Sequence, residues 1–197
     1  MSTPWELPTS LTVGGEEWKI RTEYREVFDI IKYFGNPDYE IDEQWFICLD
    51  ILFVDFDIDN PPPENIIAEM QKQAIEFIDA GIKDDGRKKP RMIDWIKDAP
   101  IMAAPISKVL GKDVRNPEPI HWWTFLAAYM ESGGENSVWT SVLNIRNKLA
   151  KGIPQSKWEK HEREFYRDNR AIIDLEYKKS DRPPEEKAAL DELFGRK

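Results

Sequence analysis

The chain has a single cysteine, Cys48, among its 197 residues, so an internal disulfide is excluded. No signal peptide is recognisable at the start, and together these features are typical of a protein of a reducing cytoplasm. Long apolar runs are also missing. The longest, 45–54, contains Asp50 and is half of the roughly 20 residues needed to span a bilayer. We therefore expect no membrane partner.

Histidine is almost as scarce, with only His121 and His161, so the usual spacing of zinc ligands is absent. The segment 55–59 alternates carboxylates like a calcium loop, but Asn60 and Ile66 stand where such a loop has its glycine and its bidentate glutamate. We interpret the segment as a solvated turn in which Asp59 or Asn60 caps the next helix. No metal site is predicted.

Nucleophiles and phosphate-binding loops are missing as well. Cys48 lies in an apolar stretch and is interpreted as a core residue, because a buried cysteine behaves as a small hydrophobe. The glycine pairs at 14–15 and 133–134 lack the pattern of a phosphate loop. We predict no catalytic residue and no cofactor, and we expect the protein not to be an enzyme.

Basic residues are outnumbered, with 28 Lys and Arg against 37 Asp and Glu, for a net charge of −9. This balance argues against nucleic acid as a partner, because phosphate binding needs clustered Lys and Arg. The charge is also polarised: residues 1–80 hold 5 basic and 18 acidic side chains, whereas 144–182 hold 11 and 7. Either these faces are simply solvated, or opposite ends of neighbouring copies attract each other.

Apolar residues make up 41% of the chain, including 8 Trp, 9 Phe and 6 Tyr, which is enough for a substantial core. Gly14-Gly15 between short alternating segments predicts a β-hairpin over about 9–21 that packs on a helix. Beyond it the apolar period becomes 3.6, which predicts helices. The fold class is therefore mainly α, a compact multi-helix single domain with a short N-terminal β-hairpin.

Caps, prolines and glycines divide the helical part into segments. Thr22 is a candidate cap for the first helix, Asn136 for the sixth, and Ser156–Glu159 forms a capping box for the seventh. Pro105 should break or bend the fourth helix, which begins near Asp98 and Pro100. The predicted helices cover about 22–34, 42–53, 64–81, 98–105, 120–133, 136–152 and 156–179, with a charged loop at 82–91.

The domain organisation follows from the same signals. Residues 1–182 are expected to form the single domain, and Pro183-Pro184 separates from it a C-terminal amphipathic tail, 183–197. The apolar side of this tail consists of Ala189, Leu190, Leu193 and Phe194.

Trp122-Trp123 is the most unusual local pattern, because adjacent residues on a helix point about 100° apart. Both indoles can be buried only if the helix is packed on two sides, and this core interpretation is favoured. In the alternative, one indole points inward and the other lies in a groove that receives a partner. We expect His121 to cap or hydrogen-bond at the start of this helix.

The order of several motifs resembles a known family. The motifs are 7–10 with the hairpin and Thr22-Glu23-Tyr24-Arg25, then His121-Trp122-Trp123-Thr124-Phe125, then 145–148 and 164–167. Together they resemble the bacteriophage family named after gene product fifteen of a Listeria phage, found in long-tailed phages (siphoviruses) and prophages of Gram-positive bacteria. The resemblance covers residues 7–178, and the box at 121–125 is its most specific part. In that family 99–104 is expected to be continuous helix, from which Pro100 and Pro105 depart.

The resemblance implies a tail assembly chaperone in the host bacterial cytoplasm. Such a chaperone binds the tape measure protein and keeps it soluble until the tail tube polymerises around it. Further partners allowed by the resemblance are the major tail protein, a companion tail chaperone and other copies of this chain. The alternative is a structural or adaptor component retained in the tail, and a small cytoplasmic enzyme is a weaker third.

Apolar grooves between helices would suit reversible binding of a helical client. Two sets of side chains are candidates for this contact. The first is in the box and the helix that follows it, Trp122, Trp123, Phe125 and Tyr129; the second is in the tail, Leu190, Leu193 and Phe194.

Overall fold

The hairpin forms where the two adjacent glycines predict it. In the computed structural model, which describes residues 5–34, 36–82, 89–134 and 137–175, β1 (Ser10–Val13) pairs antiparallel with β2 (Glu16–Lys19). Gly14 and Gly15 have φ angles of 60° and 83°, as a two-residue hairpin turn of this twist requires. The hairpin packs on a helix, as expected: the Gly14 N–H donates to Glu69, at 2.9 Å, and Val13 is buried.

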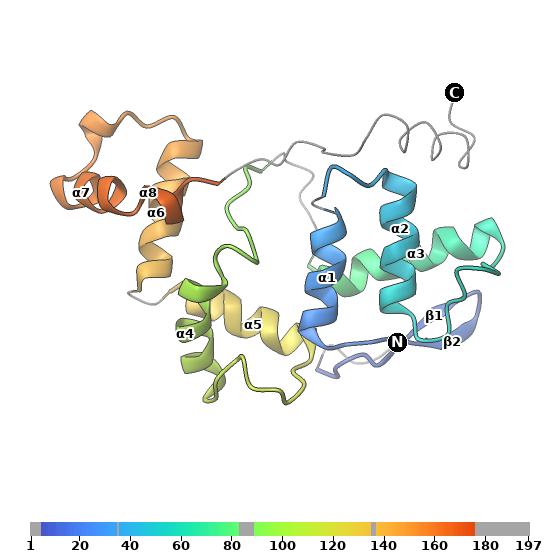
Figure 1. Cartoon of the computed structure of the whole chain (residues 1–197). Helices are drawn as coiled ribbons and strands as arrows, with labels where there is room; N and C mark the ends of the chain where they lie inside the picture. Colours follow the sequence, from blue (N-terminus) through green and yellow to red (C-terminus); the bar gives the residue numbers. More distant parts are fainter. Residues whose placement is uncertain (1–4, 35, 83–88, 135–136, 176–197) are drawn as a thin grey trace, which may run out of the picture.

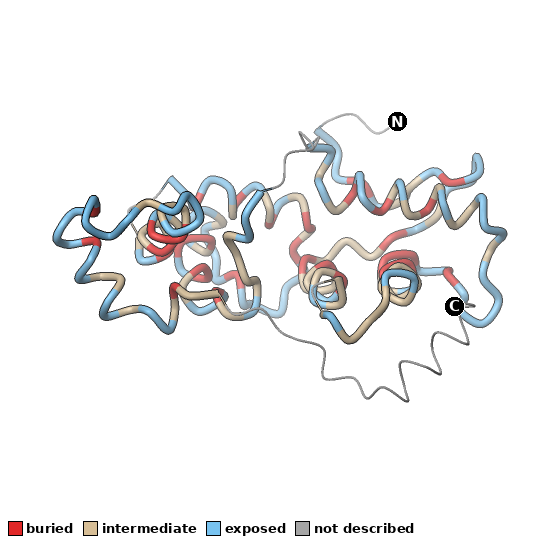
Figure 2. The backbone as a smooth tube through the Cα atoms, turned by 90° about the horizontal axis from the view of Figure 1, so that it is seen from above, coloured by how far each residue is buried: buried red, intermediate tan, exposed pale blue. Residues whose placement is uncertain are grey.

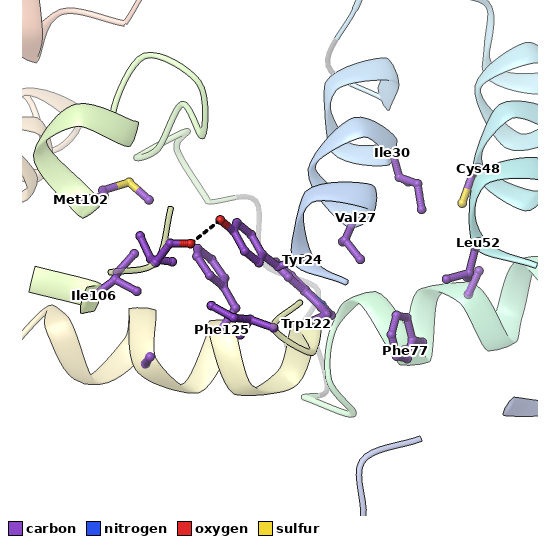
Figure 3. Close-up of a cluster of buried hydrophobic side chains, with 14 of the residues drawn as sticks. Tyr24, Val27, Ile30, Cys48, Leu52, Phe77, Met102, Ile106, Trp122 and Phe125 are labelled. Carbon is purple, nitrogen blue, oxygen red and sulfur yellow. Dashed lines mark hydrogen bonds between the residues drawn. The ribbon is translucent and has the colours of Figure 1, made fainter. Parts of the chain in front are cut away.

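Three helices complete the N-terminal half of the molecule: α1 (Tyr24–Phe34), α2 (Ile41–Leu52) and α3 (Glu64–Ile78). The apolar stripe of α1, with Val27 and Ile30, faces Cys48 and Leu52 of α2 (Figure 3). The buried residues of α1 and α2 lie on the sides of these helices that face α3 and the hairpin, and the exposed residues lie on their outer sides (Figure 2).

The second half consists of α4 (Ala99–Leu110), α5 (Trp122–Ser132), α6 (Val138–Ala150), a 3₁₀ turn η1 (Gln155–Lys157), α7 (Lys160–Asp168) and α8 (Arg170–Ile173). The helix α5 lies against both α4 and α1, so it joins the two halves (Figure 1). Buried side chains form one continuous cluster from Val13 to Ile173. The fold is therefore a compact, mainly helical single domain with an N-terminal hairpin, as predicted. The tail 183–197 lies outside the described residues.

The predicted long helix from Ser156 to Lys179 is wrong. Trp158 is buried, and its indole N–H donates to the carbonyl of Ile153, at 3.0 Å, which keeps residue 158 extended. The capping box is therefore formed by Glu159 with Glu162, and α7 ends at Asp168. Asn169 then ends that helix, with its side-chain amide donating to the carbonyl of Phe165.

Of the two effects predicted for Pro105, a break or a bend, the break is wrong, since α4 continues to Leu110. A proline in this position removes the hydrogen bond to the carbonyl of Ile101, but its ring is buried in the core. Pro100 lies in the first turn, where a missing N–H costs little. Burial of this apolar helix therefore outweighs the loss of one backbone hydrogen bond.

Three predicted caps also differ from the structure. The first helix begins at Tyr24, where the Glu23 carboxylate accepts from the N–H of Arg25 rather than Thr22 acting as the cap. Asp59 and Asn60 do not cap α3: their N–H groups donate to Asp57, and Pro63 precedes the helix. The cap of α6 is Ser137, next to Asn136, which is outside the described residues.

The two charged parts of the sequence lie at opposite ends of the molecule. The described part of the acidic stretch, 5–34 and 36–80, contains the hairpin and α1 to α3, while α6 to α8 form the other end (Figure 1). Residues 138–174, which span α6 to α8, contain 8 basic and 5 acidic side chains. The charge polarity of the sequence is therefore a polarity along the length of the fold.

Candidate functional site: the aromatic box and the groove beside it

His121 fastens the start of α5. Its Nδ1 accepts a hydrogen bond from the backbone N–H of Trp123, at 3.1 Å, which makes it the N-cap of the helix. Its Nε2 lies 2.9 Å from the carbonyl oxygen of Pro8 and, since a carbonyl only accepts, must carry the proton. Both ring nitrogens are thus engaged in structural bonds, which confirms the predicted capping role.

Trp122 and Trp123 together hold the end of a different helix. The indole N–H of Trp122 donates to the carbonyl of Ile78, at 2.7 Å, and that of Trp123 to the carbonyl of Phe77, at 2.8 Å. These carbonyls belong to the last turn of α3, where helix carbonyls lack partners within the helix. The two indoles therefore act as a cap supplied by a neighbouring helix, and we call them the tryptophan clamp.

Both tryptophans of the clamp are at least partly buried, although adjacent residues on a helix point in different directions. Trp122 is 2% exposed and its amide N–H donates to the carbonyl of Thr22, at 2.6 Å. Trp123 is partly buried and stacks on the ring of Phe77, with centroids 6.2 Å apart. The helix is packed on two sides, which is the condition that the core interpretation required.

Phe125, the last residue of the box, belongs to the aromatic core. Phe125 is 2% exposed and stacks on Tyr24, with ring centroids 4.4 Å apart and nearly parallel planes. Figure 3 shows these rings and Trp122 between Met102 and Ile106 on one side and Phe77 on the other. The hydroxyl of Tyr24 donates to the carbonyl of Val114, at 2.8 Å. Phe125 is thus a core residue with little surface left for a partner.

Tyr129 lies further along α5, partly buried against Trp95, with ring centroids 5.0 Å apart. Burial, together with the nearby carboxylate of Asp98, raises the pKa of the Tyr129 phenol to about 12. The phenol is therefore neutral at physiological pH. The tail candidates Leu190, Leu193 and Phe194 lie outside the described residues.

An apolar groove of about 410 Å³ opens beside the clamp. It lies where α1, the end of α3, the segment around Trp95 and α5 meet, and one edge of Trp122 reaches it. Asp79 and Lys89 add one charge of each sign. Its apolar lining consists of Ile31, Ile78, Ile82, Trp95, Trp122 and Leu126.

One residue of the groove lining, Ile82, is also largely open to solvent, with 53% of its surface exposed. Among the sequence candidates that the structure describes, only Trp122 lines this groove. Trp95 was not singled out from the sequence, although the large apolar residues Ile93, Trp95 and Ile96, grouped around Asp94, are the signal that could have found it.

A second hollow, of about 510 Å³, lies at the end of α4 and is polar. Lys112 and Arg115 line it, and each is paired with a carboxylate, Glu118 and Asp113 respectively. The hydrogen bonds from Arg115 lower the pKa of Asp113 to about 2. Neither an apolar surface nor a converging set of side chains marks this hollow as a client site.

A buried ion pair supports the side of the fold that carries Trp95. The guanidinium of Arg146, on α6, donates to both carboxylate oxygens of Asp98, at 2.6 and 2.8 Å, and neither side chain is more than 3% exposed. The remaining N–H groups of Arg146 donate to the carbonyls of Met92, Ile172 and Ile173. All five donors are satisfied, so this pair joins three parts of the chain: α6, the stretch 92–98 and α8. Its sequence signal was an arginine on the apolar stripe of α6.

The remaining observations concern the cysteine, metal ligands and membrane spans of the described residues. Cys48 is fully buried, and burial raises the pKa of its thiol to about 12. Within residues 5–34, 36–82, 89–134 and 137–175, no three His, Cys, Asp or Glu side chains are grouped so that they could hold a metal ion. Over the same residues, no helix has the length and apolar character to cross a membrane.

Comparison of the chain with protein-family models, with curated proteins and with solved structures found no match.

Proposed function

We propose that this chain is a non-enzymatic phage tail assembly chaperone, which binds the tape measure protein in the host bacterial cytoplasm and keeps it soluble during tail assembly. Two features support the proposal. The order of sequence motifs resembles a family with that role, and the most specific of these motifs, the box at 121–125, supplies part of the wall of an exposed apolar groove.

The groove is the observation that carries the proposal. A long helical client presents one apolar side chain per turn on a given face, about 5.4 Å apart. A groove of about 410 Å³ takes a short stretch of such a stripe rather than a whole helix. Binding by one copy is therefore weak and reversible, as displacement by the polymerising tail tube requires.

The clamp gives this groove a rigid wall. Trp122 cannot rotate out of place without losing its hydrogen bond to Ile78, and Trp95 is held among Phe28, Trp122 and Tyr129. A preformed site loses little conformational entropy on binding, which favours affinity for an apolar stripe.

Co-expression with the tape measure protein tests the proposal. We expect the chaperone to raise the soluble fraction of that protein and to co-purify with it. Ile82→Glu places a charge at the groove rim and should reduce the recovered complex about 10-fold, since burying such a side chain is worth roughly 1.5–3 kcal/mol. Ile58→Glu, at a site 49% exposed beyond the other end of α3, is the matched control.

The proposal is contradicted if neither variant reduces the recovered complex, or if co-expression does not raise the solubility of the tape measure protein. Mass spectrometry of purified virions separates the two roles that the sequence left open. A chaperone is absent from the finished particle, whereas a structural or adaptor component is present in stoichiometric amounts.

A further inference from the structure

We propose that His121 is a pH-sensitive latch on the Trp123 half of the tryptophan clamp: the neutral ring keeps it closed, and protonation of Nδ1 releases it. This inference goes beyond the proposed function and does not rest on it, because no client takes part. It stands on three observations: the two bonds of the ring, the place of the ring at the start of α5, and the contacts of Trp123.

The two bonds of the His121 ring require its neutral form. Nδ1 accepts from the backbone N–H of Trp123, at 3.1 Å, and Nε2 carries the proton that points to the carbonyl oxygen of Pro8, at 2.9 Å. An imidazolium carries a proton on both nitrogens and accepts at neither. Protonation therefore sets two N–H groups against each other at the first turn of α5. The ring cannot turn away from this contact without leaving Pro8 as well.

The position of the ring adds to the effect of protonation. His121 is the N-cap of α5, and the N-terminus of a helix carries partial positive charge, which repels a charged ring. The N–H of Trp123 also loses its acceptor, because the first N–H groups of a helix have no partner within it. The ring is only partly buried, so protons from solvent reach it. Histidine changes charge between about pH 5 and 8, and the latch responds in this range.

The charged side chains on the elements around the ring are mostly carboxylates. They lie on the segment that contains Pro8, on the stretch bridged to residue 121, at the end of α3 and just before α5: Glu6, Glu23, Arg25, Glu76, Asp79 and Glu118. Glu23 is paired with Arg25, and both ring nitrogens are bonded to backbone groups. The carboxylates attract a charged ring through space and so make its protonation accessible. They do not replace the acceptor that the N–H of Trp123 loses.

Trp123 connects the latch to the groove. Its indole N–H donates to the carbonyl of Phe77, at 2.8 Å, and its ring stacks on that of Phe77. The next residue, Ile78, lines the groove. Trp122 is held independently of the latch, since its backbone N–H donates to the carbonyl of Thr22, at 2.6 Å. Opening of the latch therefore loosens Trp123 and the end of α3, while Trp122 stays in place.

Hydrogen exchange of the indole protons, followed by NMR in the full chain, tests this inference. The indole of Trp158 is the internal reference: it is buried, donates to the carbonyl of Ile153, at 3.0 Å, and belongs to the end of the molecule formed by α6 to α8 (Figure 1). The ratio of the two rates cancels the intrinsic pH dependence of exchange. When the pH falls from about 7.5 to about 5.5, we expect the Trp123 rate to rise about 10-fold relative to the Trp158 rate, because the cap is lost and the charge repels the first turn.

Two variants assign the effect. The side-chain oxygen of His121→Asn accepts at the N-cap but does not titrate, so its ratio should not change with pH. His161→Asn, which removes the second of the two histidines, should show the same rise as the wild-type chain. A wild-type ratio that is independent of pH overturns the proposal, and so does a rise that persists in His121→Asn or is lost in His161→Asn. The wild-type measurement stands even if His121→Asn does not fold. Because the experiment contains no client, its failure leaves the chaperone proposal standing, and failure of client binding leaves the latch standing.

Discussion

Removing the guanidinium of Arg146 should be among the most destabilising single changes in this protein. In Arg146→Met the carboxylate of Asp98, fully buried, loses both of its bonds to Arg146, and the carbonyls of Met92, Ile172 and Ile173 lose a donor. Breaking one side of a buried ion pair costs about 3–5 kcal/mol, because the remaining charge is left uncompensated. Natural domains have only about 5–15 kcal/mol of stability.

Urea unfolding followed by circular dichroism measures this cost, with the slope of the transition compared between variants. In thermal unfolding, we expect the melting temperature of Arg146→Met to fall by roughly 6–20 °C, at about 2–4 °C per kcal/mol for a chain of this size. Arg167→Met is the matched control. Its guanidinium is largely exposed and paired only with the adjacent Asp168, so it should change stability by less than about 0.5 kcal/mol.

A double-mutant cycle separates the ion pair from the lost packing of a long side chain. Asp98→Asn alone should also destabilise, and the combination with Arg146→Met should cost clearly less than the two single changes added together. The reasoning is refuted if Arg146→Met costs under about 1 kcal/mol, or if the two changes are additive.

Three further outcomes follow from the structure. Trp122→Phe and Trp139→Phe both remove an indole from a buried site, but only Trp122 loses a hydrogen bond, since the Trp139 Nε1 has no partner among the described residues. Trp122→Phe should therefore lower the free energy of unfolding in denaturant by about 1 kcal/mol more than Trp139→Phe, and equal losses would contradict the clamp. Below pH 9 the Cys48 thiol is protonated in both the folded and the unfolded chain; between pH 9 and 12 only the unfolded thiol ionises, so the free energy of unfolding should fall by up to about 1.4 kcal/mol per pH unit. Cys48→Ala should reduce this pH dependence in unfolding measured at several pH values, and a thiol reagent should react with the wild-type chain only after unfolding. If the acidic and basic ends of neighbouring copies attract, sedimentation velocity should show self-association that weakens above about 0.15 M salt, where the Debye length is about 8 Å; oligomers insensitive to salt would point to the apolar surface around the groove instead.

The parts of the fold that depend on neighbouring residues could be predicted from the sequence. The hairpin follows from Gly14-Gly15, whose positive φ angles are a local property of two glycines. The helices of the N-terminal half follow from their apolar period and their stops. By contrast, the Ser156–Glu159 box competes with the burial of Trp158, and tertiary packing decides that competition in favour of Trp158.

The candidate site could be predicted only in its parts. The sequence pointed to His121 as a cap, which the structure confirms, and favoured burial of both indoles; Trp122 is buried and Trp123 partly buried. It could not show that the two indoles reach carbonyls 44 and 46 residues earlier in the chain. Nor could it show that Trp95, Ile82 and Leu126 meet in one groove, because that depends on the packing of segments far apart in sequence.

The small size of the groove bears on how a chaperone of this kind would hold a long client. A volume of about 410 Å³ is near the lower end of the range of roughly 300–1,000 Å³ typical of small-molecule sites. A few apolar side chains buried there gain about 1.5–3 kcal/mol each, most of which offsets the loss of translational freedom on binding. On the proposed function, one copy would therefore bind weakly, and a stable complex would require many copies on successive stripes of the same client. Opposite charges at the two ends of the fold would favour such a row, and a polymerising tube could then displace the copies one at a time.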